Sequence, residues 1–471
     1  MTTVATEDLE FVCHACIGDA YLKAEIKTAG KRQICMICGK CRRSTLFDTL
    51  CERVHQIVSE EFERTASEPD NWALYKESEF DWEREGDQIE GILYEILECD
   101  EHLITALKER LSDLYFFFDE AAAGEENPYG DDAHYVLCKP NDHKLWDAWS
   151  RFEDKIRTRA RFFSRTAESV LDGIFGELSR FGTQKRPLIR DAGPDTATQF
   201  VYRARRAFGS GEIARIVERP ARELGAPPSR SAGSGRMNPR WISMFYGALD
   251  ADTCIAEIRA PVGSSVVIGK FEIIRRLRLF DLEAFRHLFV EQASFFDPGF
   301  RGLRDKAYFL GRLVSIMSRP VMPSDEDFQY LPTQAVAEYL AEKIEPRLDG
   351  LIFPSSQRDG AGENVVLFRR ASAVEPDISD DMEVHTNFGW ISEDDEDLDI
   401  TVWMKEKKQP EFPDHADHSW DGSANLPEKP EEPALRIDFD AMEVRDIRAI
   451  EYRTRTRSVR RYKHSENETP F

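Results

Sequence analysis

Residues 244–259 read MFYGALDADTCIAEIR, and this stretch decides the fold class of the second half of the chain. Its first residues are apolar and aromatic, which favours a β-strand. Asp252 is typical of a residue that caps the start of a helix, and Glu257 would then lie in the first turns of that helix. A strand followed directly by a short helix predicts a domain that mixes both kinds of element.

The same alternation continues on both sides of this stretch. Short β-rich runs occur at residues 200–203, 242–246, 265–268, 277–280, 351–353 and 365–368. Helical patterns between them cover residues 252–259, 282–290 and 333–344. Alternating strands and helices of these lengths predict an α+β or mixed α/β domain over residues 195–372.

The N-terminus carries a different signal, two Cys-x2-Cys pairs separated by eighteen residues. The four cysteines are Cys13, Cys16, Cys35 and Cys38. Two such pairs predict a zinc ribbon, because each turn directs two thiolates at one tetrahedral ion. Four thiolates close the coordination shell, so the predicted zinc is structural, with one ion per chain. Cys41 and His14 are alternative ligands that the spacing leaves open.

Patterning divides the 471 residues further. We predict a zinc ribbon over residues 1–60 and an α-helical bundle over 61–190, where apolar residues recur with a period near 3.6. An acidic, proline-containing segment over 373–433 is predicted to be a flexible insertion. Strand-like runs at 434–439 and 444–452, followed by a basic tail, complete the chain at residues 434–471.

Net charge and hydropathy limit the kinds of partner and the cellular location that we expect for this protein. The net charge of −24 disfavours nucleic acid and anionic membranes as partners. No apolar run approaches the roughly 18 residues of a membrane span, and the first residues lack the basic and apolar regions of a secretory signal. A local cysteine cluster suits a reducing compartment. These features predict a cytoplasmic protein.

Five short motifs in the second half resemble one family. They are FVYRAR with Arg203, GRMNP with Arg236, the opening stretch with Tyr246 and Glu257, DGLIFPSS with Ser355, and ENVVLF with Asn364. This series resembles the RES domain, the arginine-glutamate-serine family of NAD-consuming toxins. The resemblance implies a fold similar to ADP-ribosyltransferases, with NAD as substrate. The preceding zinc ribbon and helices resemble the HEPN-type domain that accompanies RES domains.

The resemblance and the chemistry together assign roles to four residues. Cleavage of the nicotinamide-ribose bond develops positive charge on the sugar, which the carboxylate of Glu257 would stabilise. Arg203 would bind phosphate, Tyr246 would stack on nicotinamide or bind a ribose oxygen, and Ser355 would orient the ligand. Further substrate contacts are predicted for Tyr202, Arg236, Asn364 and Ser356, the last as a substitute for Ser355.

Several alternatives stay open at this point. The acceptor of ADP-ribose would be water or phosphate in a NAD glycohydrolase or phosphorylase, and a protein or small molecule in an ADP-ribosyltransferase. A non-enzymatic alternative is an interaction protein with an inactive RES shell. The resemblance to toxins also implies an antitoxin or inhibitor protein as partner, and a homo-oligomer is a further expectation. The HEPN ribonuclease motif, an arginine followed four to six residues later by a histidine, is absent from residues 1–190, so we expect that half to sense or bind a partner.

Overall fold

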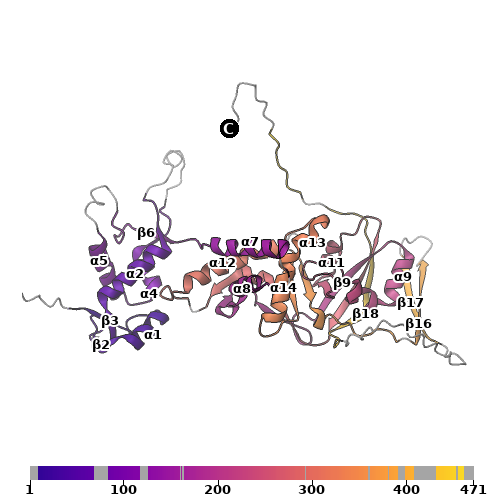
Figure 1. Ribbon diagram of the computed structural model, residues 1–471, viewed down its shortest axis with the longest axis horizontal. Coiled ribbons are helices and arrows are strands. Elements are labelled where there is room, and N and C mark those ends of the chain that lie inside the picture. The colour runs from indigo at the N-terminus through magenta and orange to yellow at the C-terminus, as the bar shows by residue number, and fades with distance from the viewer. Residues whose placement is uncertain are drawn as a thin grey trace, which may run out of the picture. The chain divides into compact units, whose positions relative to one another are not determined.

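The computed structural model describes residues 9–67, 83–116, 126–159, 161, 164–291, 293–358, 361–379, 381–390, 398–407, 431–451 and 454–460. The chain divides into two compact units (Figure 1). Unit 1 comprises Met1–Pro187 and Ala284–Ile316, and unit 2 comprises Leu188–Glu283 and Met317–Phe471. Each unit therefore contains two separate stretches of sequence.

Unit 1 begins with a three-stranded antiparallel sheet in the order β1-β3-β2, beside which one helix packs. The elements are β1 (Phe11–Cys13), α1 (Ala20–Ala29), β2 (Lys31–Ile34) and β3 (Cys41–Leu46). Asp19 caps α1, because its side chain accepts a 2.7 Å hydrogen bond from the backbone N–H of Leu22. Leu22 and Ile26 lie one turn apart on α1 and are both buried, so this face holds the helix in place.

The following part of unit 1 is helical around an apolar core. Its elements are α2 (Phe47–Glu61), α4 (Ile89–Leu97), α5 (Glu101–Tyr115) and a second sheet made of β4 (Phe62–Arg64), β5 (Asp87–Gln88) and β6 (His134–Leu137). The core includes Val54, Leu93 and Leu107, each fully buried. The sequence predicted helices alone over residues 61–190. The small sheet was missed because strands of two to four residues are too short to show an alternating pattern.

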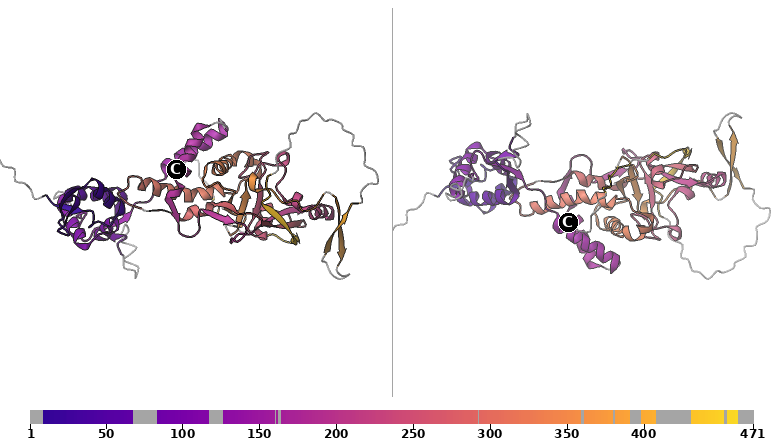
Figure 2. Two further views of the ribbon diagram at one scale, coloured as in Figure 1. Left: turned by 90° about the horizontal axis from the view of Figure 1, so that it is seen from below. Right: turned by 90° about the horizontal axis from the view of Figure 1, so that it is seen from above.

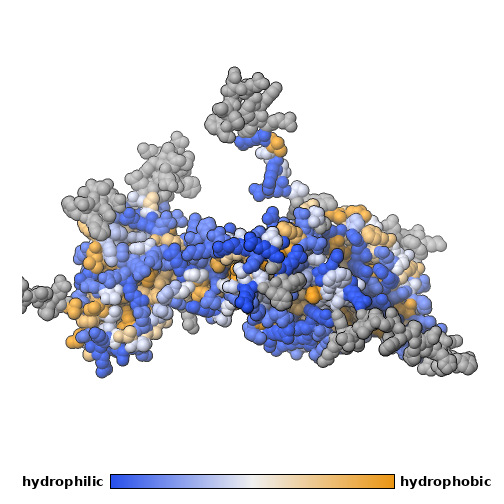
Figure 3. All heavy atoms as spheres, viewed as in Figure 1, coloured by the Kyte–Doolittle hydropathy of each residue, from blue (hydrophilic) through white to orange (hydrophobic). Residues whose placement is uncertain are grey.

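The rest of unit 1 contains α7 (His143–Thr158), α8 (Arg165–Phe175) and most of α12 (Phe300–Met317). α7 buries Trp149, Phe152 and Ile156, and the face that it presents in Figure 3 is hydrophilic. Two short strands, β7 (Phe181–Thr183) and β13 (Leu288–Val290), pair antiparallel. The helix predicted over residues 282–290 is therefore only partly correct, since a 3-10 turn (Leu282–His287) leads directly into β13.

Unit 2 is built on an eight-stranded mixed sheet in the order β18-β11-β9-β10-β15-β14-β12-β8. The strands are β8 (Ile189–Ala192), β9 (Phe200–Ala207), β10 (Phe245–Ala248), β11 (Ser265–Ile273), β12 (Leu277–Asp281), β14 (Gly350–Pro354), β15 (Glu363–Leu367) and β18 (Leu435–Asp446). Only β12 and β14 pair in parallel; the other neighbours are antiparallel. This arrangement confirms the prediction of a domain that combines helices and sheet.

The helices of unit 2 are α9 (Ser210–Glu218), α10 (Pro220–Leu224), α11 (Ala251–Ile258), α13 (Glu326–Gln329) and α14 (Leu331–Lys343). Fully buried residues such as Val201, Phe245 and Leu367 join the sheet to α9 and α10. α11 follows β10 after two residues and packs on the small cluster of Ala260, Val266 and Ile268. The predicted strand over residues 242–246 begins later than expected, at Phe245, because residues 242–244 lie in the loop before it.

The C-terminal region differs from the prediction of a flexible insertion over residues 373–433. Within it, β16 (Met382–Trp390) and β17 (Leu398–Glu406) form an antiparallel hairpin beside α9 (Figure 2). Residues 408–430 of the segment lie outside the described residues. The run predicted at 434–439 lies almost wholly in β18, which pairs with β11 along most of its length. The run predicted at 444–452 is only partly correct, because β18 ends at Asp446 and residues 447–451 are not in a strand. β18 thus forms one edge of the sheet.

No helix in the described ranges combines the length and the apolar character needed to cross a membrane.

Candidate functional site

A cavity of about 460 Å³ opens in unit 2 beside the centre of the sheet. β9, β10, α11 and β15 contribute to its wall, together with the loops before β10 and after β14. Seven polar or charged lining residues dominate its chemistry: Arg203, Arg236, Tyr246, Glu257, Arg259, Ser356 and Asn364. Six of these seven were predicted from the sequence. They lie far apart in the chain, between Arg203 and Asn364, and the fold brings them to the same cavity.

Glu257 reaches the cavity from the last turn of α11. The helix is capped by Asp250, whose carboxylate accepts hydrogen bonds from the N–H of Thr253 (2.8 Å) and from its hydroxyl (2.7 Å). The prediction that Asp252 is the cap was wrong, because the helix begins two residues earlier than the prediction requires. Asp252 instead lies in the first turn and pairs with Arg445 at 3.0 Å.

One oxygen of the Glu257 carboxylate is held by two donors. Its Oε1 accepts a 2.6 Å hydrogen bond from Oγ of Ser355 and a 2.7 Å hydrogen bond from Nδ2 of Asn364. Its Oε2 has no hydrogen-bond partner among the described residues. Two donors to one oxygen fix the orientation of the carboxylate. The second oxygen is left available at the cavity.

Ser355 contributes to the site indirectly. It is fully buried and is not part of the cavity wall, whereas its neighbour Ser356 is. The loop after β14 is packed closely on α11, since a Cβ at Gly362 would lie 2.0 Å from Oγ1 of Thr253. Arg358 reinforces the contact by donating to Asp250 at 2.9 Å. The loop therefore places the Ser355 hydroxyl against Glu257.

Arg203 projects from β9 and is unusually isolated for a charged side chain. Its Nη1 is shielded from solvent and has no hydrogen-bond partner in the part of the chain that the structure describes. No ion pair to Arg203 occurs among the described residues, and its guanidinium lies 5.1 Å from the ring centre of Phe245. Burial lowers the pKa of Arg203 to about 10. A guanidinium with unsatisfied donors and no counter-ion is suited to bind an anionic group that enters the cavity.

Tyr246 has its hydroxyl engaged within the protein. The hydroxyl donates to Oδ1 of Asn238 at 2.6 Å and accepts from the backbone N–H of Met237 at 3.0 Å. Burial raises the pKa of the Tyr246 phenol. Of the two roles predicted for Tyr246, stacking by the ring is compatible with this geometry, while the hydroxyl is already used to anchor the loop before β10. Both roles stay predictions.

That loop, residues 233–242, is held in place by hydrogen bonds from within the loop and from α14. Nδ2 of the buried Asn238 donates to the carbonyl oxygens of Gly233, Pro239 and Ile242, at 2.9, 3.2 and 2.8 Å respectively. From α14, Gln334 donates to the carbonyl of Gly235 at 2.8 Å. Gly235 admits no side chain, because a Cβ would lie 2.5 Å from Oδ1 of Asn238 and 2.7 Å from the Tyr246 hydroxyl.

Arg236, in the same loop, forms part of the wall near the end of α12. Its Nη1 donates to the carbonyl of Met317 at 2.8 Å, and its guanidinium lies 5.0 Å from the ring centre of Tyr330. One edge of the Arg236 guanidinium is therefore occupied by contacts within the protein. The remaining donors make it a second candidate for an anionic ligand.

Several residues of the wall were missed in the sequence, among them Arg259, Glu326 and Tyr330. Arg259 ends α11 in the left-handed conformation, with φ of 47°, and Glu326 and Tyr330 come from α13 and the residue after it. Arg259 could have been suggested by its position two residues after Glu257. Glu326 and Tyr330 carry no such signal. Conversely, Tyr202 packs in the small apolar cluster under α11, and it is not among the residues that line the cavity.

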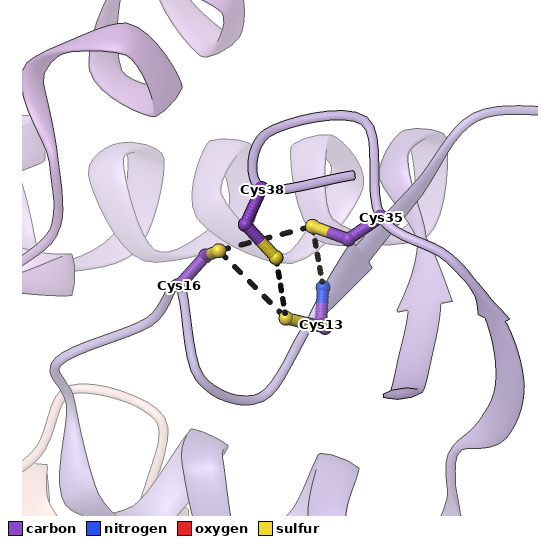
Figure 4. A group of neighbouring side chains, drawn as sticks. All are labelled: Cys13, Cys16, Cys35 and Cys38. Carbon is purple, nitrogen blue, oxygen red and sulfur yellow. Dashed lines mark hydrogen bonds between the residues drawn. The ribbon is translucent and has the colours of Figure 1, made fainter. Parts of the chain in front are cut away.

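A second candidate site lies in unit 1, where the four cysteines of the two Cys-x2-Cys pairs converge (Figure 4). Their sulfur atoms all lie within 4.8 Å of one another. The Sγ separations are 3.7 Å for Cys13 and Cys16, 3.7 Å for Cys13 and Cys38, and 3.8 Å for Cys16 and Cys35. Four sulfurs at about 2.3 Å from a central zinc would be separated by about 3.8 Å at the corners of a tetrahedron. The cluster is therefore compatible with a tetrahedral metal ion.

Neither alternative ligand joins this cluster. The metal-binding group found among the described residues contains the four predicted cysteines, without Cys41 or His14. The surroundings of the four thiols differ and shift their pKa values in different directions. Burial raises the pKa of Cys13 and Cys16, whereas the backbone N–H of Lys40 lowers the pKa of Cys38 to about 7. A bound divalent cation would hold all four as thiolates.

Unit 2 is thus an α+β domain whose cavity combines a fixed carboxylate with Arg203 and Arg236, which have no ion-pair partner among the described residues. Residues 185–387 match the family model of the RES domain, so this part of the chain is a RES domain. No curated protein and no solved structure shows significant similarity to the chain. The expected likeness to ADP-ribosyltransferases and to HEPN domains accordingly stays a prediction.

Proposed function

We propose that unit 2 is an enzyme that cleaves the bond between nicotinamide and ribose in NAD. The observation that carries this proposal is the cavity shared by Glu257 and Arg203. Within the described ranges, one carboxylate oxygen of Glu257 has no hydrogen-bond partner and Arg203 has no counter-ion. The RES domain belongs to a NAD-related toxin-type family, which supports the choice of substrate.

The roles follow from how charge moves in the reaction. When the C1′–N bond breaks, its electron pair leaves with nicotinamide, and positive charge develops on the ribose ring. A carboxylate held in position before the reaction stabilises this charge without reorganisation, which is the part we assign to Glu257. Arg203 and Arg236 bind the pyrophosphate. An oxygen of water or phosphate then forms the new bond to C1′, and the attacking group loses its proton if it is water.

The test is to incubate the purified full-length protein with NAD and to follow nicotinamide, ADP-ribose and its phosphate ester, with and without phosphate. We expect nicotinamide to be released, and the second product to identify the acceptor. Glu257→Gln should lower the rate at least about 100-fold. Asp252→Asn, on the same helix but engaged with Arg445, is the matched control and should keep its activity. Wild-type protein that leaves NAD intact would refute the proposal.

Transfer of ADP-ribose to a protein would use the same cavity and differ only in the acceptor. Labelled NAD in the same experiment distinguishes this alternative, because it would leave label on a macromolecule. A catalytically inactive shell is a poorer account, because selection for stability alone would not retain an isolated, buried guanidinium such as that of Arg203.

We also infer that Cys13, Cys16, Cys35 and Cys38 hold one structural zinc ion, because their spacing fits a Zn–S4 tetrahedron and leaves no coordination position for a reacting molecule. A role as a toxin or defence effector, controlled by an antitoxin or inhibitor protein, is part of the same proposal. Expression in a bacterial host should arrest growth and deplete NAD, and Glu257→Gln should relieve both effects.

A further inference from the structure

Charge is distributed unevenly along this acidic chain. The net charge is −24, yet residues 9–46 contain seven lysines and arginines and only three carboxylates. These residues form the cysteine module at the start of unit 1, namely β1, α1, β2 and β3. A prediction based on total charge overlooks such a region.

All three carboxylates in this module are committed to other partners. Asp19 is buried and caps α1. Glu25 pairs with Arg53 at 3.0 Å, and Glu10 pairs with Arg110 at 2.7 Å. They are therefore unable to neutralise the basic residues around them.

Six of the basic residues form what we call the basic patch: Lys27, Lys31, Arg32, Lys40, Arg42 and Arg43. Five are exposed and Arg42 is half-buried. Within the described part of the chain, none of the six has an ion-pair partner. Lys23 is left out of the patch because it lines a small cavity together with Glu98 and Asp100.

The sheet places two of these charges side by side, on the face opposite to that of Lys31 and Arg42. β2 is the edge strand of the sheet, and Arg32 lies directly opposite Arg43 on β3. Two like charges in this position destabilise a strand pair. Arg43 also donates to the carbonyl oxygens of Thr28 (2.7 Å) and Gly30 (3.3 Å), which joins the end of α1 to the same surface.

An exposed apolar residue lies among the charges. Ile34, two residues after Arg32 on β2 and hence on the same face, has 69% of its surface exposed. It pairs in register with Cys41, which is also exposed. The face thus combines two guanidinium groups with an apolar surface, a combination that suits phosphates together with the planar faces of bases.

We propose that the basic patch binds nucleic acid, chiefly through its phosphate backbone. The occupant is argued from charge complementarity, since six unpaired cations on one small module match a polyanion. This function is separate from NAD cleavage in unit 2. It also revises the expectation, drawn from the net charge of −24, that nucleic acid is excluded as a partner.

The test uses full-length, zinc-loaded protein and a fluorescein-labelled 20-nucleotide RNA, with single-stranded and duplex DNA of the same sequence as parallel probes. Fluorescence anisotropy at several salt concentrations gives the affinity. We expect binding whose logarithm falls linearly with the logarithm of salt concentration. Arg32→Glu/Arg43→Glu should weaken binding at least about 10-fold and reduce the steepness of the salt dependence by roughly two phosphate contacts.

The matched control is Arg151→Glu/Lys185→Glu, which changes net charge equally at two exposed positions outside the patch. It should bind like the wild type. Zinc content and circular dichroism establish that both variants are folded. The proposal is overturned if the wild type binds none of the probes at about 50 mM salt, if the control loses as much affinity as the patch variant, or if the patch binds vesicles containing phosphatidylserine and no nucleic acid.

Discussion

Ser355 and Glu257 are 98 residues apart in the chain and are joined by a 2.6 Å hydrogen bond from Oγ of Ser355 to Oε1 of Glu257. The buried hydroxyl holds the carboxylate and does not border the cavity. We therefore expect Ser355 to act as a positioning residue, and a direct contact with the ligand, as predicted from the sequence, has no support in this geometry.

Ser355→Ala tests this assignment. Loss of one donor to Glu257 should lower kcat by about 10-fold while KM changes little, because a single hydrogen bond to a charged group contributes roughly 1.5–3 kcal/mol. A raised KM with an unchanged kcat would instead favour direct contact with the substrate.

Arg203→Met should separate stability from function. The native protein buries a cation without a counter-ion, so the variant should be more stable by about 1–3 kcal/mol at pH 7.5 and should bind NAD poorly. Burial lowers the pKa of Arg203 from its ordinary value to about 10 in the folded state. Between these values the unfolded chain binds more protons, so wild-type stability rises with pH. Thermal unfolding of both proteins should show the advantage of the variant shrinking above pH 10; a variant less stable than wild type at pH 7.5 contradicts this account.

Gly235→Ala should disrupt the loop before β10. The added Cβ would collide with Asn238 and with the Tyr246 hydroxyl, so we expect the rate of nicotinamide release to fall at least about 10-fold, as displacements of about 1 Å can cost more than that. Gly233→Ala is the matched control, because its Cβ would meet no atom within 4 Å. Equal activity of the two variants would show that the loop does not position the site.

Cys35→Ser should abolish the metal content of unit 1. Elemental analysis should find one zinc per chain in the wild type and almost none in the variant, with partial loss of helical circular dichroism, because such modules fold with their metal. Cys41→Ser should retain zinc, since Cys41 lies outside the cluster. Zinc retained in Cys35→Ser, or absent from the wild type, would contradict the assignment.

Local patterns in the sequence were sufficient for part of this structure. The cysteine pairs could be recognised because each pair is confined to four residues. The helix that carries Glu257 could be recognised because its cap and its apolar spacing are local features of the sequence. The cap itself was misplaced by two residues, since Asp250 and Asp252 offer the same chemistry and only packing against Arg358 and Gly362 distinguishes them.

Long-range contacts account for what could not be predicted. The buried partners of the Tyr246 hydroxyl and the contribution of Tyr330 to the cavity depend on how distant segments meet. The hairpin of β16 and β17 was obscured by the acidic composition around it. In the first unit, total charge concealed the separate charge of a 38-residue module.

The pairing of β18 with β11 has a practical consequence for anyone who shortens this protein. A polypeptide that stops at residue 387, where the family match ends, would leave β11 as the outermost strand, with the backbone N–H and C=O groups that face β18 unpaired. β11 is long and largely apolar, and exposed strands of this kind recruit other chains. The residues of β18 therefore protect this edge of the sheet from aggregation, and recombinant versions of the protein should retain them through residue 446.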